Sequence, residues 1–211
     1  MSEKHDVKKA LDCYRATRGR FRVLEVPDLR YLMVDGHGDP NTSEAFAAAV
    51  GTLQPLSWTL KFASRNELGR DYVVPPLEGL WHAPDLTAFT TARDESAWDW
   101  TLMMLVPDWV EDTLVDAARD RVCEAGTAAR LDDVRLELLA EGLSVQTLHV
   151  GSFDDEGPVL ARLHEEVLPA EGLEPRGTHH EIYLSDFRRV APEKLRTILR
   201  QPVTRVGAPG G

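Results

Sequence analysis

Short apolar runs alternate with amphipathic stretches along the first part of the chain. The run Tyr31–Val34 ends at a glycine-rich turn over residues 35–40, which predicts a strand followed by a loop. The next segment predicts a helix that Thr42 or Ser43 can cap. Its apolar face has helical spacing and consists of Phe46, Val50 and Leu53.

Three prolines predict interruptions of this pattern. Pro55 should kink or end the helix, because proline lacks the N–H that an interior helical position donates, although the apolar run over residues 56–62 suggests that helical structure resumes. Residues 72–74 predict a short strand. Pro75 and Pro76 then argue against regular ladder pairing, so we expect an extended bend over residues 75–81.

Residues 97–106 alternate between two faces, as the residues of a strand do. Trp98 and Trp100 fall on the same face of this predicted strand. A helix is then expected to begin at Pro107 and to finish near Gly126, since proline suits the first turn and glycine follows the last.

The second half of the chain repeats this plan. Residues 131–139 predict a strand or the end of a bent helix, and residues 144–150 predict a clear strand. An amphipathic helix over 160–167 and a strand over 180–184 follow. We expect a final helix over residues 192–202, between two prolines.

A strand, a glycine turn and a helix occur in this order in both halves. Residues 34–36 (Val-Asp-Gly) and 149–151 (His-Val-Gly) mark the two turns, about half a chain length apart. The repeat indicates an internal duplication of a strand-helix-strand-strand unit, with two independent domains as the alternative. We therefore expect one α+β domain over residues 1–211, with repeats over about 24–110 and 111–205 and an N-terminal arm over 1–23.

Charge and hydropathy narrow the possible partners. The chain carries 24 Lys and Arg residues against 35 Asp and Glu residues, a formal net charge of -11. Clustered cations bind polyanions, so this balance argues against nucleic acid and against an anionic membrane surface. No apolar run reaches the roughly 18 residues of a membrane span, and the first residues lack the apolar core of a secretory signal. We therefore expect a cytoplasmic protein.

Tryptophan is the residue type that points to a ligand site. Five tryptophans lie between positions 58 and 109. Their side chains give a flat apolar ligand rigid walls, and the indole N–H can fix its orientation. Trp81, Trp98 and Trp100, together with Tyr72, are therefore candidates for lining a pocket. The alternative is that these rings form the core of the protein.

Glu181 and Tyr183 alternate on the strand predicted over 180–184, so their side chains share one face. Ile182 on the other face suits a side covered by helices, which directs Glu181 and Tyr183 toward a cleft. A carboxylate beside aromatic walls is desolvated, which raises its pKa and suits it to general acid or base catalysis. The alternative is a solvated glutamate on a strand face.

Other chemistries find little support in the sequence. His179 and His180 are adjacent on a strand and point to opposite faces, so they do not chelate one metal ion together. Ser152 and Ser185 lack the Gly-x-Ser-x-Gly elbow of a serine hydrolase. We therefore expect no metal and no other cofactor.

Six strings of the sequence match one family pattern. They are VDGHGDPN at 34–41, VPPLEGLW at 74–81, WDWTLM at 98–103, EG at 141–142, QTLHVG at 146–151 and HHEIYLSD at 179–186. Together they resemble the GyrI-like small-molecule-binding proteins, over about residues 24–203. The last string, followed by Pro-Glu-Lys-Leu at 192–195, is the most specific part. Phe187 departs from the pattern, because many relatives have proline there.

The resemblance implies a fold and an activity. The fold is a pseudo-twofold pair of strand-helix-strand-strand units, with antiparallel sheet around a central ligand cleft and helices outside. The stand-alone subfamily that these strings most resemble is implied to hydrolyse the cyclopropane of DNA-alkylating natural products in an aromatic cage. The site residues are then Glu181 and Tyr183 for catalysis, and Tyr72, Trp81, Trp98, Trp100 and His149 for ligand binding.

Two other functions remain open at this point. Without turnover, the same cleft would sequester or sense planar hydrophobic or cationic compounds, with Glu181 as counter-ion and the aromatic rings as cation–π walls. The third possibility is an interaction with a protein such as a topoisomerase, for which the sequence identifies no surface.

Overall fold

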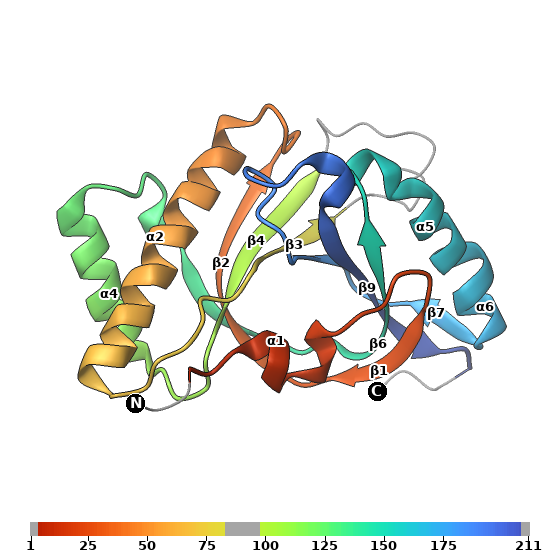
Figure 1. Cartoon of the computed structure of the whole chain (residues 1–211), viewed down its shortest axis with the longest axis horizontal. Coiled ribbons are helices and arrows are strands. Elements are labelled where there is room, and N and C mark those ends of the chain that lie inside the picture. The colour runs from red at the N-terminus through yellow and green to blue at the C-terminus, as the bar shows by residue number, and fades with distance from the viewer. Residues whose placement is uncertain (1–3, 83–97, 208–211) are drawn as a thin grey trace.

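The computed structural model describes residues 4–82 and 98–207, and in these residues nine strands form a curved antiparallel sheet (Figure 1). The strands are β1 (Arg22–Val26), β2 (Leu29–His37), β3 (Leu77–His82), β4 (Asp99–Val106), β5 (Arg135–Leu139), β6 (Gly142–Val150), β7 (Leu173–Pro175), β8 (His179–Tyr183) and β9 (Arg196–Arg205). The sheet order is β1-β6-β9-β8-β3-β4-β2-β5, and β7 pairs with β9.

Two groups of helices flank the sheet, and a short helical segment precedes it. In Figure 1, α2 and α4 lie together on the left, and α5 and α6 lie on the right. The helices are α1 (Val7–Ala10), α2 (Glu44–Glu67), α4 (Asp112–Ala125), α5 (Gly157–Arg162) and α6 (Leu168–Ala170), with a π-helical turn over Leu163–Val167 between the last two. Short 3-10 turns lie at Asp12–Tyr14, Leu131–Asp133, Phe153–Asp155 and Pro192–Lys194.

The strand order is symmetric about the central β8–β3 pair. On one side the order is β3-β4-β2, from the unit β2-α2-β3-β4, and on the other it is β8-β9-β6, from the unit β6-α5-β8-β9. The strand before each unit pairs with the other half, since β1 pairs with β6 and β5 pairs with β2. The expected α+β fold of two strand-helix-strand-strand units is therefore confirmed.

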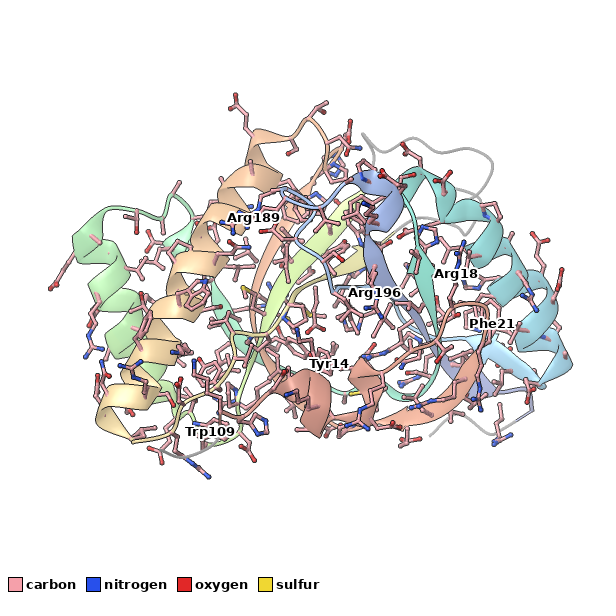
Figure 2. The ribbon with its side chains drawn as sticks, viewed as in Figure 1. Tyr14, Arg18, Phe21, Trp109, Arg189 and Arg196 are labelled. Carbon is pink, nitrogen blue, oxygen red and sulfur yellow. The ribbon has the colours of Figure 1, made fainter. Side chains whose placement is uncertain are left out.

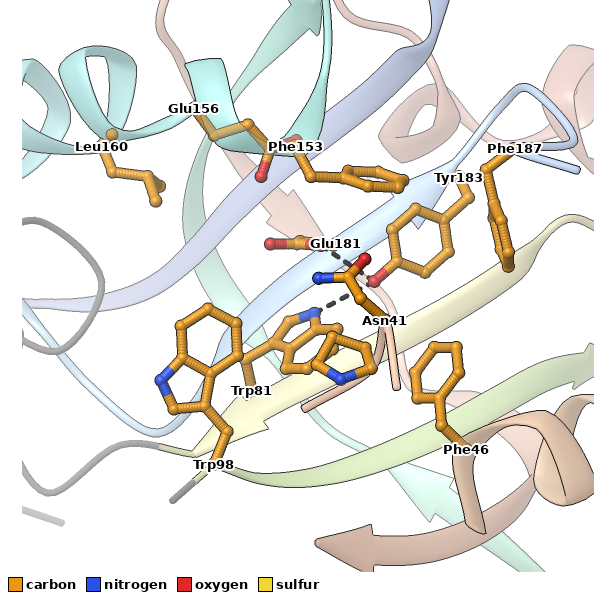
Figure 3. Close-up of a pocket in the computed structure, with 12 residues that line it drawn as sticks. Asn41, Phe46, Trp81, Trp98, Phe153, Glu156, Leu160, Glu181, Tyr183 and Phe187 are labelled. Carbon is orange, nitrogen blue, oxygen red and sulfur yellow. Dashed lines mark hydrogen bonds between the residues drawn. The ribbon is translucent and has the colours of Figure 1, made fainter. Parts of the chain in front are cut away.

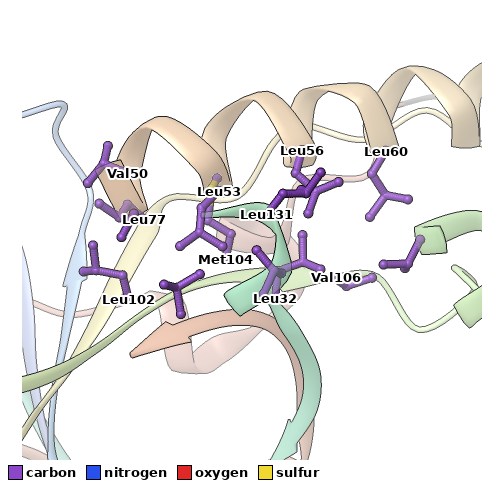
Figure 4. Packing of buried hydrophobic residues seen from close by; sticks show 14 of the residues in the cluster. Leu32, Val50, Leu53, Leu56, Leu60, Leu77, Leu102, Met104, Val106 and Leu131 are labelled. Carbon is purple, nitrogen blue, oxygen red and sulfur yellow. The ribbon is translucent and has the colours of Figure 1, made fainter. Parts of the chain in front are cut away.

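The long helix α2 covers one face of the first half of the sheet. Its side chains Leu53, Leu56 and Leu60 are fully buried against Leu32 and Leu102 from the strands (Figure 4). The helix begins after Ser43, whose hydroxyl accepts a hydrogen bond from the Phe46 N–H, as the sequence predicted. It does not end at Pro55, and the apolar run over residues 56–62 continues the helix to Glu67.

The opposite face packs on the N-terminal segment. Val7, Cys13 and Tyr14 are buried with Ile182 and Ile198 in a second apolar cluster. Glu181 and Tyr183 do share the other face, but that face carries α2 and α5. The expectation that the long helices cover the Ile182 side was therefore wrong, because the N-terminal segment covers that side instead.

Two predicted elements around the prolines were wrong. Residues 72–74 form no strand, and Tyr72 makes only an isolated bridge with His5. Residues 77–82 form the central strand β3, paired with β4 and β8, instead of an unpaired bend. The prolines end just before Leu77, so every position of β3 retains its N–H.

The predicted final helix over 192–202 was also wrong. Only a 3-10 turn forms at Pro192–Lys194, and Arg196–Arg205 is the long strand β9 between β6 and β8. Helix α4 begins at Asp112 rather than at Pro107, and it ends at Gly126 as predicted. Seven consecutive residues of β9, Thr197–Val203, are buried, and such a central strand lacks the alternation that distinguishes a strand from a helix.

Candidate functional site

An aromatic pocket lies on the helix-bearing face, above the central strands β3 and β8 (Figure 3). Its cavity has a volume of about 90 Å³. The sheet supplies its floor, the start of α2 one wall, and the start of α5 with the turn before it the other. The described residues that line it are Pro40, Asn41, Phe46, Trp81, Trp98, Phe153, Glu156, Gly157, Leu160, Glu181, Tyr183 and Phe187.

A glycine allows the polar groups of the floor to meet. Gly79 of β3 lies opposite Glu181 of β8 in the sheet register. A Cβ at this position would lie 3.0 Å from the Tyr183 hydroxyl and 3.1 Å from the Trp81 indole nitrogen. The side chains of Trp81 and Tyr183 therefore approach each other directly over the bare backbone of residue 79.

Three side chains form a hydrogen-bonded chain in the pocket. The Trp81 Nε1–H donates to the Tyr183 hydroxyl oxygen over 3.1 Å. The Tyr183 hydroxyl in turn donates to Glu181 Oε2 over 2.8 Å (Figure 3). Because the single phenolic proton is directed at Glu181, Tyr183 holds the carboxylate in place, and Oε1 is not used in this chain.

Tyr183 stays protonated at neutral pH. Burial, reinforced by the negative charge of Glu181, raises the pKa of Tyr183 well above its ordinary value. The hydroxyl therefore remains a donor to the carboxylate throughout the physiological range. On the far side, Glu181 Oε1 lies 3.6 Å from His179 Nε2.

Four further aromatic side chains line the pocket around this polar chain. Phe46 stacks on Trp81 with centroids 6.3 Å apart, and Trp98 meets the edge of Trp81 at 5.4 Å. Phe153 and Phe187 meet Tyr183 edge-to-face, at 5.6 Å and 6.1 Å. Offset and edge-to-face contacts of this kind are the favoured arrangements for aromatic side chains, so the walls are rigid.

The pocket brings together four of the seven predicted site residues. Glu181, Tyr183, Trp81 and Trp98 all line it, on β8, on β3 and at the start of β4. Trp81 and Trp98 are less than a tenth exposed and also belong to the core cluster beside the pocket. The sequence left two alternatives for these tryptophans, a pocket wall or the core. In the structure, Trp81 and Trp98 belong to both.

The structure places the other three predicted site residues outside the pocket lining. Trp100 is buried beneath Phe46 and donates from Nε1 to the Gly38 carbonyl over 3.1 Å. Tyr72 packs edge-to-face on Trp109, away from the pocket. His149 is buried at the end of β6, with Nε2 2.9 Å from the Ser152 carbonyl, and so holds the turn that follows.

Several pocket residues were missed by the sequence reasoning. Phe46 was assigned only to a helix face, and Phe153, Glu156 and Leu160 carried no functional prediction. Glu156 is 5% exposed, and glutamate is seldom buried to this extent. Their shared position, at the start of a helix after a glycine turn in each half, was the available signal. Phe187, noted only as a departure from the family pattern, adds a ring beside Tyr183.

A buried ionic network lies directly behind the pocket, on the opposite face of β8. His180 is fully buried, with Nδ1 2.9 Å from Glu141 and Nε2 2.9 Å from Glu78. Arg200 donates to Glu141 over 2.6 Å, and Tyr14 donates to Glu78. Burial opposes a charge on His180, but Glu141 and Glu78 outweigh it and raise the pKa of this imidazole above its ordinary value.

Neither a metal centre nor a membrane span is present in the part of the chain that the structure describes. No three His, Cys, Asp or Glu side chains among residues 4–82 and 98–207 are placed to share a metal ion. Among the same residues, every helix is too short or too polar to cross a bilayer.

Comparison with known proteins identifies close structural relatives. An uncharacterized conserved protein from Listeria innocua is 35% identical, with a TM-score of 0.85 over 95% of this chain and 100% of that chain. A hydrolase from Listeria innocua is 33% identical, with a TM-score of 0.81 over the same shares of the two chains. A search among curated proteins gave no match.

More distant similarities concern one half of the chain or the fold alone. The model of the GyrI-like small molecule binding domain matches residues 111–204. The C-terminal domain of EcmrR is 11% identical, with a TM-score of 0.58 over 89% of this chain and 98% of that chain. At this identity the likeness concerns the fold and carries no information about the ligand.

Proposed function

The chain belongs to the GyrI-like family of small-molecule-binding domains, and from this premise we propose that its aromatic pocket hydrolyses strained, cyclopropane-containing DNA-alkylating compounds. The observation that carries the proposal is the chain from Trp81 through Tyr183 to Glu181, inside an otherwise aromatic pocket. The 33% identity to a hydrolase from Listeria innocua supports the reaction class.

The pocket suits a ligand with one flat, reactive end. A cavity of about 90 Å³ is smaller than the roughly 300–1,000 Å³ of pockets that enclose drug-sized ligands. It therefore fits the reacting end of such a compound, with the remainder at the mouth. Phe46, Trp98 and Phe153 would stack on or against that flat end and exclude water from its faces.

The reaction needs one base, because ring strain already supplies the driving force. Glu181 Oε2 is held by Tyr183, so Oε1 takes a proton from water. The water oxygen bonds to a ring carbon while one carbon–carbon bond of the cyclopropane breaks. The electron pair of that bond passes into the conjugated dienone, which becomes a phenolate. The proton on Glu181 then returns to the phenolate oxygen, and the net change is the addition of one water.

Tyr183 acts in this scheme as a positioning residue. Its proton is directed at Glu181, and its raised pKa keeps that proton in place. Trp81 fixes the phenolic oxygen from the other side. The carboxylate therefore has one orientation before the ligand arrives.

Sequestration of cations is the second candidate function, and the two carboxylates of the pocket favour it. Glu156 and Glu181 both line a cavity with aromatic walls. Carboxylates and ring faces together attract a cation with delocalised charge. Glu181→Gln should then weaken the binding of a cationic dye far more than the binding of a neutral planar analogue. Tryptophan fluorescence measures both affinities. Equal losses for both dyes would exclude the counter-ion role.

The hydrolase proposal is tested with a matched pair of glutamate substitutions. Purified protein is incubated with a spirocyclopropane alkylator, and the ring-opened alcohol is quantified by chromatography. Glu181→Gln should lower the catalysed rate by about 10²–10⁴, the usual contribution of a positioned base. Glu193→Gln removes the same charge from an exposed turn and should leave the rate unchanged. A Glu181→Gln rate equal to that of the wild type would overturn the proposal.

A further inference from the structure

A second hollow lies where the N-terminal segment meets β6 and β9, and arginines dominate its lining. Its volume is about 360 Å³. Arg15, Arg20, Arg22 and Arg196 line it, and no Asp or Glu does so among the residues that the structure describes. In a chain with a formal net charge of -11, this grouping is opposite in sign to the molecule as a whole.

Two of these arginines are held by partners and two are not. Arg22 pairs with Asp12, and Arg15 donates to the Lys9 carbonyl. The side chains of Arg20 and Arg196 make no hydrogen bond or ion pair within residues 4–82 and 98–207. The hollow therefore has two guanidinium groups with all their donors available.

The floor of the hollow is rigid. Gln146 is 1% exposed, and its amide is fixed at both ends, by the Arg200 Nε–H at 2.9 Å and by the Arg15 carbonyl at 3.0 Å. Tyr14 is held by its hydrogen bond to Glu78 in the buried network. Figure 2 labels Tyr14 on the N-terminal segment and Arg196 at the start of β9, which both line the hollow. A preformed floor lowers the entropy that a ligand loses on binding.

From these observations we propose that the hollow binds a small molecule carrying two or more phosphate or carboxylate groups. Unpaired like charges in one hollow repel each other, and an anion between them relieves this repulsion. The planar fork of a guanidinium matches both anionic groups with two parallel hydrogen bonds. A nucleic acid would meet the acidic remainder of the surface, so a small ligand fits better. The site is separate from the aromatic pocket, and the proposal does not depend on the hydrolase reaction.

The test uses two double substitutions that remove the same charge. Pyrophosphate and citrate are titrated into the full chain by calorimetry, at low and at moderate salt. Arg20→Ala/Arg196→Ala should weaken binding by at least about 100-fold, since each arginine supplies charge-assisted hydrogen bonds worth a factor of about ten or more. Arg65→Ala/Arg205→Ala removes two exposed arginines elsewhere and should leave the affinity within about twofold.

Each outcome decides the proposal. Tight binding of either anion, lost only in the first double variant, supports it, and the tighter anion identifies the group that is recognised. Absence of binding to the wild type at about 1 mM of both anions overturns it. Equal weakening in both double variants also overturns it, because non-specific attraction would then be the cause. Circular dichroism checks folding, and the single change Arg20→Gln replaces the double variant if that variant does not fold.

Discussion

At the scale of single residues, the pocket depends on one phenolic proton. Tyr183 donates it to Glu181 and accepts from Trp81, and burial keeps the phenol neutral. Tyr183→Phe retains the ring and removes both contacts. We expect kcat to fall by about 10- to 100-fold with little change in KM, because a misplaced carboxylate slows proton transfer without changing the aromatic walls. Steady-state kinetics measure kcat and KM separately. A rise in KM with kcat unchanged would contradict the positioning role.

Sequence reasoning reached the polar groups of the site and the walls made by Trp81 and Trp98, but it missed the phenylalanines. Glu181 and Tyr183 could be placed on one face because strand alternation is a local rule. Phe46 and Phe153 are far apart in sequence and come to one pocket only because α2 and α5 flank the same strands. Trp100 obeyed the predicted alternation with Trp98, yet it is covered by Phe46. Local periodicity identifies a face of the sheet, but it does not tell which residues on that face are covered.

The Trp100 ring packs closely against the backbone of Gly36. A Cβ there would lie 2.0 Å from the Trp100 ring, which supports Phe46. Gly36→Ala should therefore displace Trp100 and lower the free energy of unfolding by about 1–3 kcal/mol. Gly51→Ala is the matched control, because no atom lies within 4 Å of its Cβ and alanine favours a helix. In thermal unfolding, the melting temperature of Gly36→Ala should lie below that of the wild type, and that of Gly51→Ala should equal or exceed it. Equal melting temperatures for the two variants would contradict this packing.

At the scale of elements, prolines misled the sequence reasoning in different ways. Pro75 and Pro76 precede β3 and do not interrupt it, and Pro202 lies inside β9, where it was read as the end of a helix. Residues 97–106 were predicted as a strand and β4 forms there, although both of its faces are buried, Leu102 in one apolar cluster and Met103 in the other. Strand β9 is also buried on both faces and was not recognised, because its residues show no alternation that would separate a strand from a helix.

Pro55 offers a direct test of the energetics of α2. The helix runs from Glu44 to Glu67, so Pro55 removes one interior hydrogen bond from it. Pro55→Ala should restore this bond and raise the free energy of unfolding by about 1–3 kcal/mol. Chemical denaturation monitored by circular dichroism measures the change. A decrease in stability would mean that the proline ring makes packing contacts that outweigh the missing bond.

At the scale of the whole molecule, the buried network joins segments from both halves of the sheet. Glu78 is on β3, His180 on β8 and Arg200 on β9, with Glu141 between β5 and β6. Burial alone would raise the pKa of Glu141, but His180 and Arg200 outweigh it and lower this pKa to about 2. A single broken partner would leave a buried charge without compensation, at a cost of about 3–5 kcal/mol.

The network predicts how stability depends on pH. A carboxylate whose pKa is lowered on folding stabilises the protein above its unfolded pKa and loses this effect as the pH falls toward the folded value. The free energy of unfolding should therefore drop between pH 4.5 and about 2, by on the order of 3 kcal/mol from Glu141. His180 remains charged across this window, and its own contribution declines only as the pH rises through its raised pKa. Urea titrations across the acid range, with Glu141→Gln as the comparison, test this. A wild type and a variant with the same acid dependence would contradict it.

The duplication was the part of the whole-molecule architecture that the sequence predicted best. The matching strings at 34–36 and 149–151 lie at the ends of β2 and β6, which occupy equivalent places in the symmetric sheet. The exchange of β1 and β5 between the halves could not be foreseen, since pairing between strands far apart leaves no local pattern.

The central claim is that the pocket turns over its ligand, and counting turnovers tests it most directly. A spirocyclopropane alkylator is supplied in large excess over the protein, and the ring-opened alcohol is followed against time by chromatography. We predict that product rises steadily to many equivalents per protein molecule and that Glu181→Gln removes this increase. Product that stops at one equivalent would contradict the claim, because the protein would then trap its ligand instead of hydrolysing it.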